Sequence, residues 1–275
     1  MLYPVTFRPI LKSVIWGGAD ICPFKGIEPL QDGIGESWEL SHVEGNVSVV
    51  AEGSLAGKSL EELINTYGDK LLGKKVMDSF GTTFPLLIKF IDAKQDLSIQ
   101  VHPDDELAMK RHQSMGKTEM WYIVDAEPDA KLIYGFKKEI SRNEFERRIT
   151  DNTLLDICNQ VPVKKGDVFF IDSGTLHAIG KGILIAEIQQ NSNTTYRVYD
   201  YGRVGKDGRP RELHVDKAIE VTKLQPISRD IKPLASPDFF AEFDMKLLAQ
   251  CDPHAEMSDE DREWIDAPAV GKEIL

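Results

Sequence analysis

One short segment, LSIQVH at residues 97–102, alternates strictly between apolar and polar side chains. This period of two is typical of a β-strand that packs one face into an apolar layer. Because residues two apart in a strand share a face, Gln100 and His102 are expected to point together. The segment therefore predicts a β-rich fold in which one strand directs polar side chains towards a common site.

Two candidate metal ligands follow in other strand-like runs. Glu119 lies in KTEMWYIV at residues 117–124, and His177 ends GDVFFIDSGTLH at residues 166–177. A lone histidine in a strand is more often a hydrogen-bonded core residue than a ligand, but the combination favours metal binding. Two imidazoles, a carboxylate and a side-chain amide form a mixed N/O donor set for zinc or a similar divalent ion. The predicted ligands are Gln100, His102, Glu119 and His177.

The spacing around His177 resembles the second cupin motif. Gly166, Asp172, Gly174 and His177 follow the pattern G-x5-D-x-G-x2-H, in which cupins usually carry proline where Asp172 stands. This departure is expected to affect the turn rather than the chemistry.

Longer segments resemble type I mannose-6-phosphate isomerases (phosphomannose isomerases), in family order from about residue 4 to residue 220. They are WGG at 16–18, GESWELS at 35–41, FPLLIK at 84–89, LSIQVHPD at 97–104, GKTEMWY at 116–122, GTLHAIG at 174–180 and TYRVYDYGR at 195–203. The resemblance implies a mainly β protein, a cupin jelly-roll barrel with helical insertions and a second, shortened cupin-like β unit. It also implies one zinc ion per chain and the interconversion of mannose 6-phosphate and fructose 6-phosphate.

The chain is expected to divide into two parts. Residues 1–224 form the metal-binding catalytic unit, with helical insertions near 59–80 and 141–158. Residues 225–275 form a partial second β unit and an acidic C-terminal tail. Whether a partner or a dimer contact covers the edge of that unit stays open, so a monomer or a homodimer is expected.

Local signals place individual elements within this plan. S-x-x-E capping boxes at 59–62 and 141–144 predict helix starts. Residues 213–224 are expected to form a helix, and residues 168–171 and 183–188 to form strands. Residues 4–56 are expected to contain short strands and turns.

Composition limits the class of protein. The formal net charge of −12 argues against nucleic-acid binding, and no apolar run is long enough to span a bilayer. The start lacks the pattern of a secretory signal, and the three cysteines are widely spaced. A cytoplasmic enzyme with reduced thiols and no membrane partner is expected.

An acidic chain that binds a sugar phosphate needs a local cluster of cations. Arg197, Arg203 and Lys117 lie within the matching segments and are candidates for it. The resemblance aligns Arg197 with the family's active-site arginine. The substrate-binding residues are predicted to be Ser98, Lys117 and Arg197.

Aldose–ketose isomerisation moves a proton between C2 and C1 through an enediol, so it requires a base and stabilisation of oxyanion charge. The predicted catalytic residues are Lys117, Glu187 and Arg197. The base stays open between Glu187, Lys117 and a hydroxide on the metal. Asn193, where relatives commonly carry aspartate, leaves a non-catalytic sugar-phosphate-binding paralogue as an alternative, and a metal-dependent cupin oxygenase is a third.

Overall fold

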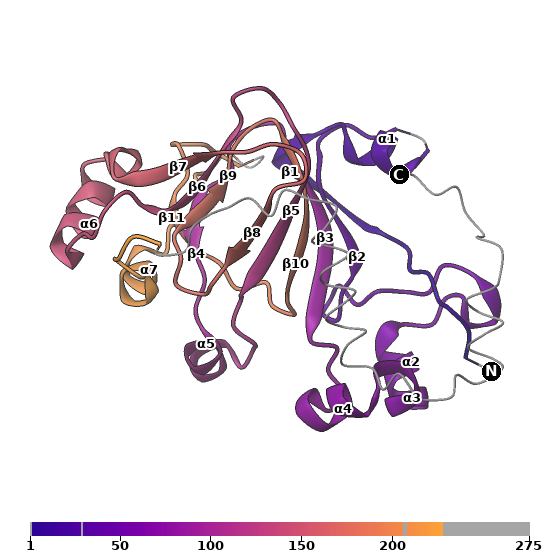
Figure 1. Ribbon diagram of the computed structural model, residues 1–275. Coiled ribbons are helices and arrows are strands. Elements are labelled where there is room, and N and C mark those ends of the chain that lie inside the picture. Colours follow the sequence, from indigo (N-terminus) through magenta and orange to yellow (C-terminus); the bar gives the residue numbers. More distant parts are fainter. Residues whose placement is uncertain (1, 29, 206–207, 228–275) are drawn as a thin grey trace. The chain divides into compact units, whose positions relative to one another are not determined.

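The computed structural model describes residues 2–28, 30–205 and 208–227, and its strands form two antiparallel sheets (Figure 1). The six-stranded sheet has the order β1 (Ile10–Gly18), β2 (Ile34–Leu40), β3 (Leu86–Ala93), β10 (Ile183–Gln190), β5 (Glu119–Ala126) and β8 (Val168–Ile171). The five-stranded sheet has the order β11 (Tyr196–Tyr199), β4 (Ile99–Val101), β9 (His177–Ile179), β6 (Lys131–Phe136) and β7 (Cys158–Pro162).

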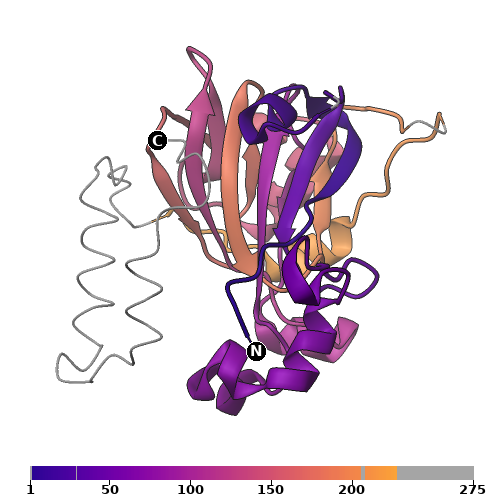
Figure 2. The same cartoon turned by 90° about the vertical axis from the view of Figure 1, so that its right-hand side faces the viewer.

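Helices connect and flank the strands. They are α1 (Ile21–Lys25), α2 (Leu60–Tyr67), α3 (Asp69–Leu72), α4 (Lys74–Phe80), α5 (Asp105–His112), α6 (Arg142–Thr150) and α7 (Val215–Val221), with short 3₁₀ turns at Gly53–Leu55 and Leu154–Asp156. In Figure 2 the purple segment that contains α2, α3 and α4 lies at one end of the long strands.

The two sheets enclose an apolar core, and polar side chains from both sheets lie beside it. Trp121 and Ile123 of the six-stranded sheet pack with Leu132 and Ile179 of the five-stranded sheet in a single buried cluster. A second cluster fills the outer side of the five-stranded sheet, where α6 and α7 lie (Figure 1). This sheet is therefore buried on both faces.

Burial of this sheet on both faces explains the positions of the residues in the LSIQVH segment at 97–102. Ile99 and Val101 pack in the outer cluster with Phe145 of α6 and Ala218 of α7. The intervening Gln100 consequently points to the other face, between the sheets. Ile99 and Val101 therefore pack against the helices, whereas Leu97 packs in the inner cluster and Gln100 lines the site.

Both predicted capping boxes begin helices. At α2, Ser59 Oγ accepts the backbone N–H of Glu62, and Glu62 accepts the N–H of Ser59. At α6, Ser141 accepts the N–H of Glu144, but the Glu144 carboxylate lies 3.6 Å from Arg148 Nε instead. The side-chain cap alone is therefore enough to begin α6.

The mainly β class, the antiparallel sheets and the helical insertions are confirmed. Within residues 4–56, which were expected to hold strands and turns, the structure adds α1, whose Ile21 and Cys22 pack on the outer face of the six-stranded sheet. The second β unit predicted at 225–275 lies outside the described residues except for 225–227. No helix in the described part of the chain is long and apolar enough to cross a membrane.

Candidate metal centre and active-site cavity

Strand register brings the predicted metal ligands together. Gln100 of β4 pairs in register with His177 at the start of β9 on one side. On the other side it pairs with Arg197 of β11. His102 follows β4 directly, and Glu119 opens β5 in the opposite sheet. The ligands therefore come from both sheets.

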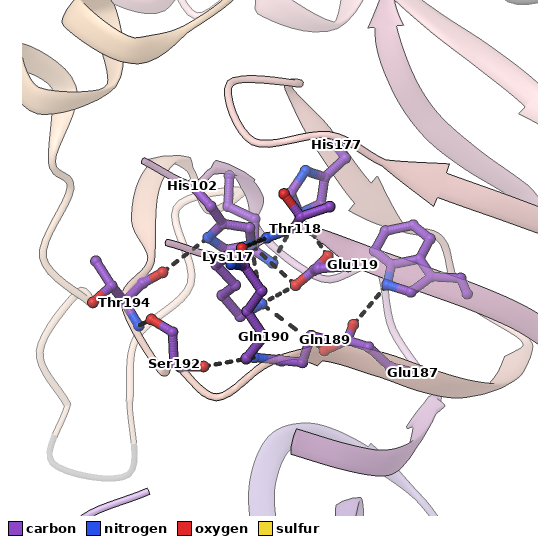
Figure 3. A network of polar contacts seen from close by, with 12 residues as sticks. His102, Lys117, Thr118, Glu119, His177, Glu187, Gln189, Gln190, Ser192 and Thr194 are labelled. Carbon is purple, nitrogen blue, oxygen red and sulfur yellow. Dashed lines mark hydrogen bonds and ion pairs between the residues drawn. The ribbon is translucent and has the colours of Figure 1, made fainter. Parts of the chain in front are cut away.

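The cluster is compact and buried (Figure 3). Glu119 Oε1 lies 3.3 Å from His102 Nε2, and Glu119 Oε2 lies 3.5 Å from His177 Nε2. Gln100 Nε2 is 3.4 Å from His177 Nε2. One donor atom from each of the two histidines and the glutamate lies within 4.8 Å of the others.

The histidine rings are oriented for metal binding. His102 Nδ1 donates to Thr194 O at 2.9 Å, and His177 Nδ1 donates to Thr175 O at 2.8 Å, which leaves both Nε2 lone pairs facing the cluster. Burial, reinforced by neighbouring positive charge, lowers the pKa of both imidazoles well below the usual range, so they are neutral. Glu119 Oε2 is buried without a hydrogen-bond partner among the described residues. These donors fit a divalent cation.

A tight turn fixes the position of His177. Gly174 adopts φ +80° and donates its N–H to His102 O at 2.9 Å. A Cβ on this glycine would lie 2.8 Å from Val221 O, so the backbone conformation and the close approach both require glycine. Asp172 lies in the same turn, where its carbonyl accepts the N–H of Thr175 at 3.0 Å.

Lys117 borders the metal cluster. Its Nζ donates to Glu119 Oε1 and lies 3.1 Å from His102 Nε2. Burial lowers the pKa of Lys117 to about 7, against the opposing effect of Glu187. Lys117 and Glu119, two residues apart, therefore point to the same side of the chain.

Glu187 belongs to a buried chain of opposite charges. Its Oε1 lies 3.0 Å from Lys89 Nζ and 3.9 Å from Lys117 Nζ, and its Oε2 accepts the indole N–H of Trp121 at 2.6 Å. Glu36 lies 3.5 Å from the other side of Lys89. Burial favours the neutral carboxyl, but Lys89 and Lys117 outweigh it and lower the pKa of Glu187 to about 2.

No role was predicted for Lys89, although its place within an apolar strand is unusual for a charged residue. It interrupts the apolar strand LLIKFIDA, where a charged residue is costly unless it is paired. Its strand neighbour in register is Glu187, which supplies the partner.

A cavity of about 200 Å³ connects these groups. Its wall includes Gln100, Lys117, Glu187 and Arg197, together with the exposed Asn193. Arg197 Nε donates to Ser98 Oγ at 3.3 Å, so these two predicted substrate-binding residues are adjacent.

The structure brings Arg211, which was not among the candidates, into the cavity wall, while Arg203 is absent from its lining. Arg203 donates instead to Asp96 O and Asp200. No local sequence signal marked Arg211, because it follows an irregular segment.

Two antiparallel sheets around a buried His-Glu-His cluster beside a polar cavity define a cupin-like protein with a candidate metal centre. Residues 6–136 match the catalytic domain of type I phosphomannose isomerases. The chain is 42% identical over 232 residues to the probable mannose-6-phosphate isomerase GmuF of Bacillus subtilis, which covers 83% of this chain and 71% of the relative.

The structural comparison agrees. The crystal structure of the mannose 6-phosphate isomerase from Bacillus subtilis superposes with a TM-score of 0.75 at 38% identity, covering 82% of this chain and 70% of that one. The chain therefore belongs to the type I phosphomannose isomerase family.

A short stretch has a different relative. Over 30 residues, 11% of this chain, it is 71% identical to the antitoxin PemI of Escherichia coli, of which the match covers 35%. This match is too short to define a fold.

Proposed function

We propose that the chain is a mannose-6-phosphate isomerase that interconverts D-mannose 6-phosphate and D-fructose 6-phosphate through an enediol. The observation that carries the proposal is the cluster of His102, Glu119 and His177 beside a cavity lined by Lys117 and Glu187. It occurs in a chain 42% identical to a probable isomerase of the same family.

The metal centre would consist of Gln100, His102, Glu119 and His177, and we assign one zinc ion to it. Neutral imidazoles with one carboxylate and one amide suit zinc better than the all-oxygen sites of magnesium or calcium. When bound, the ion would supply Lewis-acid polarisation of the sugar oxygens.

Proton transfer between C2 and C1 is assigned to the pair of Lys117 and Glu187, which line the cavity 3.9 Å apart. Glu187 remains ionised because Lys89 and Lys117 lower its pKa to about 2, and it orients both ammonium groups. Arg197 presents a fixed positive charge on the same wall, suited to an enediolate oxygen or a phosphate.

The catalytic unit is assigned to residues 1–224, with the helices near 59–80 and 141–158 as insertions. Every residue given a role lies within this range. We place the enzyme in the cytoplasm, since Cys22 and Cys158 are both buried as free thiols.

A coupled isomerase assay on zinc-loaded protein tests the function directly. Glu119→Gln should lower metal affinity by more than roughly 100-fold, because loss of even an outer-shell partner costs about 10- to 100-fold. Glu106→Gln removes the same charge from an exposed position on α5 and should retain metal and turnover.

Two results would count against the proposal. Full activity in protein verified to be metal-free would refute the metal assignment. Tight binding of mannose 6-phosphate without conversion by zinc-loaded protein would favour the sugar-phosphate-binding paralogue, for which Asn193 in the cavity wall is the supporting observation.

A further inference from the structure

Arg197 lies on an edge strand, where one side of its backbone faces away from the sheet. β11 is the outermost strand of the five-stranded sheet, and Arg197 pairs in register with Gln100 of β4 on its inner side. The outward N–H and C=O groups of an edge strand have no neighbouring strand to bond with. A partner from outside the sheet is therefore needed to fix this side of Arg197.

His214 supplies that partner. Its Nδ1 accepts the backbone N–H of Arg197 at 3.1 Å, and its own backbone N–H donates to Arg197 O at 2.7 Å. Two residues earlier, Glu212 O accepts Nη1 of the Arg197 guanidinium at 3.0 Å. The short segment 212–214 thus binds the N–H, the C=O and the side chain of one arginine.

The packing of α7 brings His214 to this position. His214 directly precedes α7, and its carbonyl accepts the N–H of Ala218 at 2.9 Å. Ala218 is fully buried in the outer cluster with Tyr196 and Val198 of β11, beside which α7 lies (Figure 1). Because Tyr196 and Val198 flank Arg197 in the chain, the contact between helix and strand carries His214 to the arginine.

The protonation state of His214 decides whether its side chain can make this contact. Nδ1 accepts an N–H only while it carries no proton, so the bond requires the tautomer with the proton on Nε2. Nε2 lies 3.7 Å from Oε2 of Glu212, and this carboxylate favours a proton at that nitrogen. A second proton, on Nδ1, would set two donors against each other and add a positive charge beside Arg197.

The charged groups around His214 come from three elements. Burial lowers the pKa of His214, Glu212 of the preceding segment opposes this, and Arg197 of β11 and Lys217 of α7 lower it further. The phenol ring of Tyr196 lies 6.3 Å from the imidazole between ring centroids, and Lys217 Nζ lies 5.8 Å from its centroid. The imidazole is therefore neutral at neutral pH.

We propose that His214 is a positioning residue for Arg197, and that its neutral imidazole holds the arginine in the orientation that the reaction requires. The role of Arg197 rests on the proposed isomerase function, whereas the contact between the two residues does not. When His214 gains its second proton at acid pH, this contact is lost. Turnover should then fall by a route that does not involve the metal ligands.

The test compares His214→Asn with His214→Leu. Asparagine offers an amide oxygen in place of Nδ1 and does not titrate, whereas leucine fills the space without an acceptor. His42→Leu is the matched control. Nδ1 of His42 accepts the backbone N–H of Phe84 at 3.0 Å, a bond of the same kind between the segments that follow β2 and precede β3.

The first measurement is kcat/KM for mannose 6-phosphate between about pH 5 and 8, the range in which an imidazole titrates, on protein verified to be metal-replete. At the upper end, His214→Leu should lower kcat/KM by roughly tenfold, the loss expected when a hydrogen-bond donor is left unpaired, and His214→Asn should stay within roughly twofold of wild type. Towards the lower end, wild type should lose more activity than His214→Asn. His42→Leu should keep the pH profile of the wild type.

The second measurement, amide hydrogen exchange at Arg197, needs no substrate. In His214→Leu, exchange of the Arg197 N–H should accelerate by roughly tenfold, and in His214→Asn it should remain protected. The amide of Ile123, which donates to Asp167 O at 2.9 Å within the other sheet, reports on the global fold. A general loss of stability would accelerate both amides, whereas the proposal requires acceleration at Arg197 alone.

The two measurements separate this inference from the proposed function. If the wild type converts no mannose 6-phosphate but the Arg197 amide loses protection in His214→Leu, the contact stands while the isomerase assignment fails. If the wild type is active, equal kcat/KM values for His214→Leu and His42→Leu would overturn the proposal. Should His214→Leu fail to fold, the pH profile of His214→Asn decides, and a profile identical to that of the wild type would be the refuting result.

Discussion

Replacing Glu187 with glutamine tests the buried chain of charges that lines the proposed active site. The substitution keeps the shape of the side chain but removes the charge opposite Lys89, which is 8% exposed and lies 3.0 Å away. Glu36 remains 3.5 Å from Lys89 but is its weaker partner by distance. We expect Glu187→Gln to destabilise the fold, independently of any effect on turnover.

The expected loss of unfolding free energy in Glu187→Gln can be obtained in two ways. A carboxyl group whose pKa falls from 4.5 to about 2 on folding contributes roughly 3 kcal/mol of stability. Removing one partner of a buried ion pair typically costs about 3–5 kcal/mol. For a chain of this size, roughly 3 kcal/mol corresponds to a fall in Tm of about 6–12 °C.

The pH dependence has a definite sign. Because the folded-state pKa of Glu187 lies below its unfolded value of 4.5, its contribution is fully present above about pH 5. It is lost progressively as the pH falls towards 2. The difference in unfolding free energy between wild type and Glu187→Gln should therefore shrink over this window.

Urea unfolding of both proteins, at equal metal content and at several pH values from 3 to 7, measures this difference. Glu146→Gln, an exposed change on α6, should stay within about 0.5 kcal/mol of wild type. Adding Lys89→Met to Glu187→Gln should restore stability, because it removes the unpaired buried ammonium group. A difference below about 0.5 kcal/mol, or one that does not vary with pH, would refute the reasoning.

Two further substitutions test the scaffold. Gly116→Ala places a Cβ 2.6 Å from the backbone carbonyl carbon of Asp104, so the segment leading to Glu119 must shift. The metal content measured after dialysis should therefore fall. An unchanged metal content would contradict this prediction. Ser59→Ala removes the side-chain cap from Glu62 N and should cost about 1 kcal/mol, or roughly 2–4 °C in Tm by calorimetry, with an unchanged Tm as the opposing result.

Some features of this protein could be predicted from the sequence because their causes are local. The capping boxes at Ser59 and Ser141 depend on residues three apart, and both helices begin where predicted. The alternation at 97–102 correctly separated Gln100 from Ile99 and Val101, but Leu97 packs in the inner cluster because the strand itself extends only over Ile99–Val101. By contrast, α1 was missed because its stability comes from packing against distant residues such as Leu184.

The site shows the same division between local and distant causes. The residue types for a metal centre were evident in the sequence, because two histidines, a glutamate and a glutamine occur in strand-like segments. Their separation of 3.3–3.5 Å at Glu119 depends on both sheets. The roles proposed for these side chains remain predictions.

The chemical groups that the strands carry can be read from the amino-acid sequence, and so can the face that most of them occupy within a strand, because both depend on neighbouring residues. Which charges meet depends instead on the tertiary fold. Lys89 meets Glu187 through the register of β3 and β10, and Asp200 holds Arg211 against the cavity across an irregular segment. Such pairings follow from the packing of the whole fold, because charged groups far apart in the chain interact only after the sheets have brought them within a few ångströms.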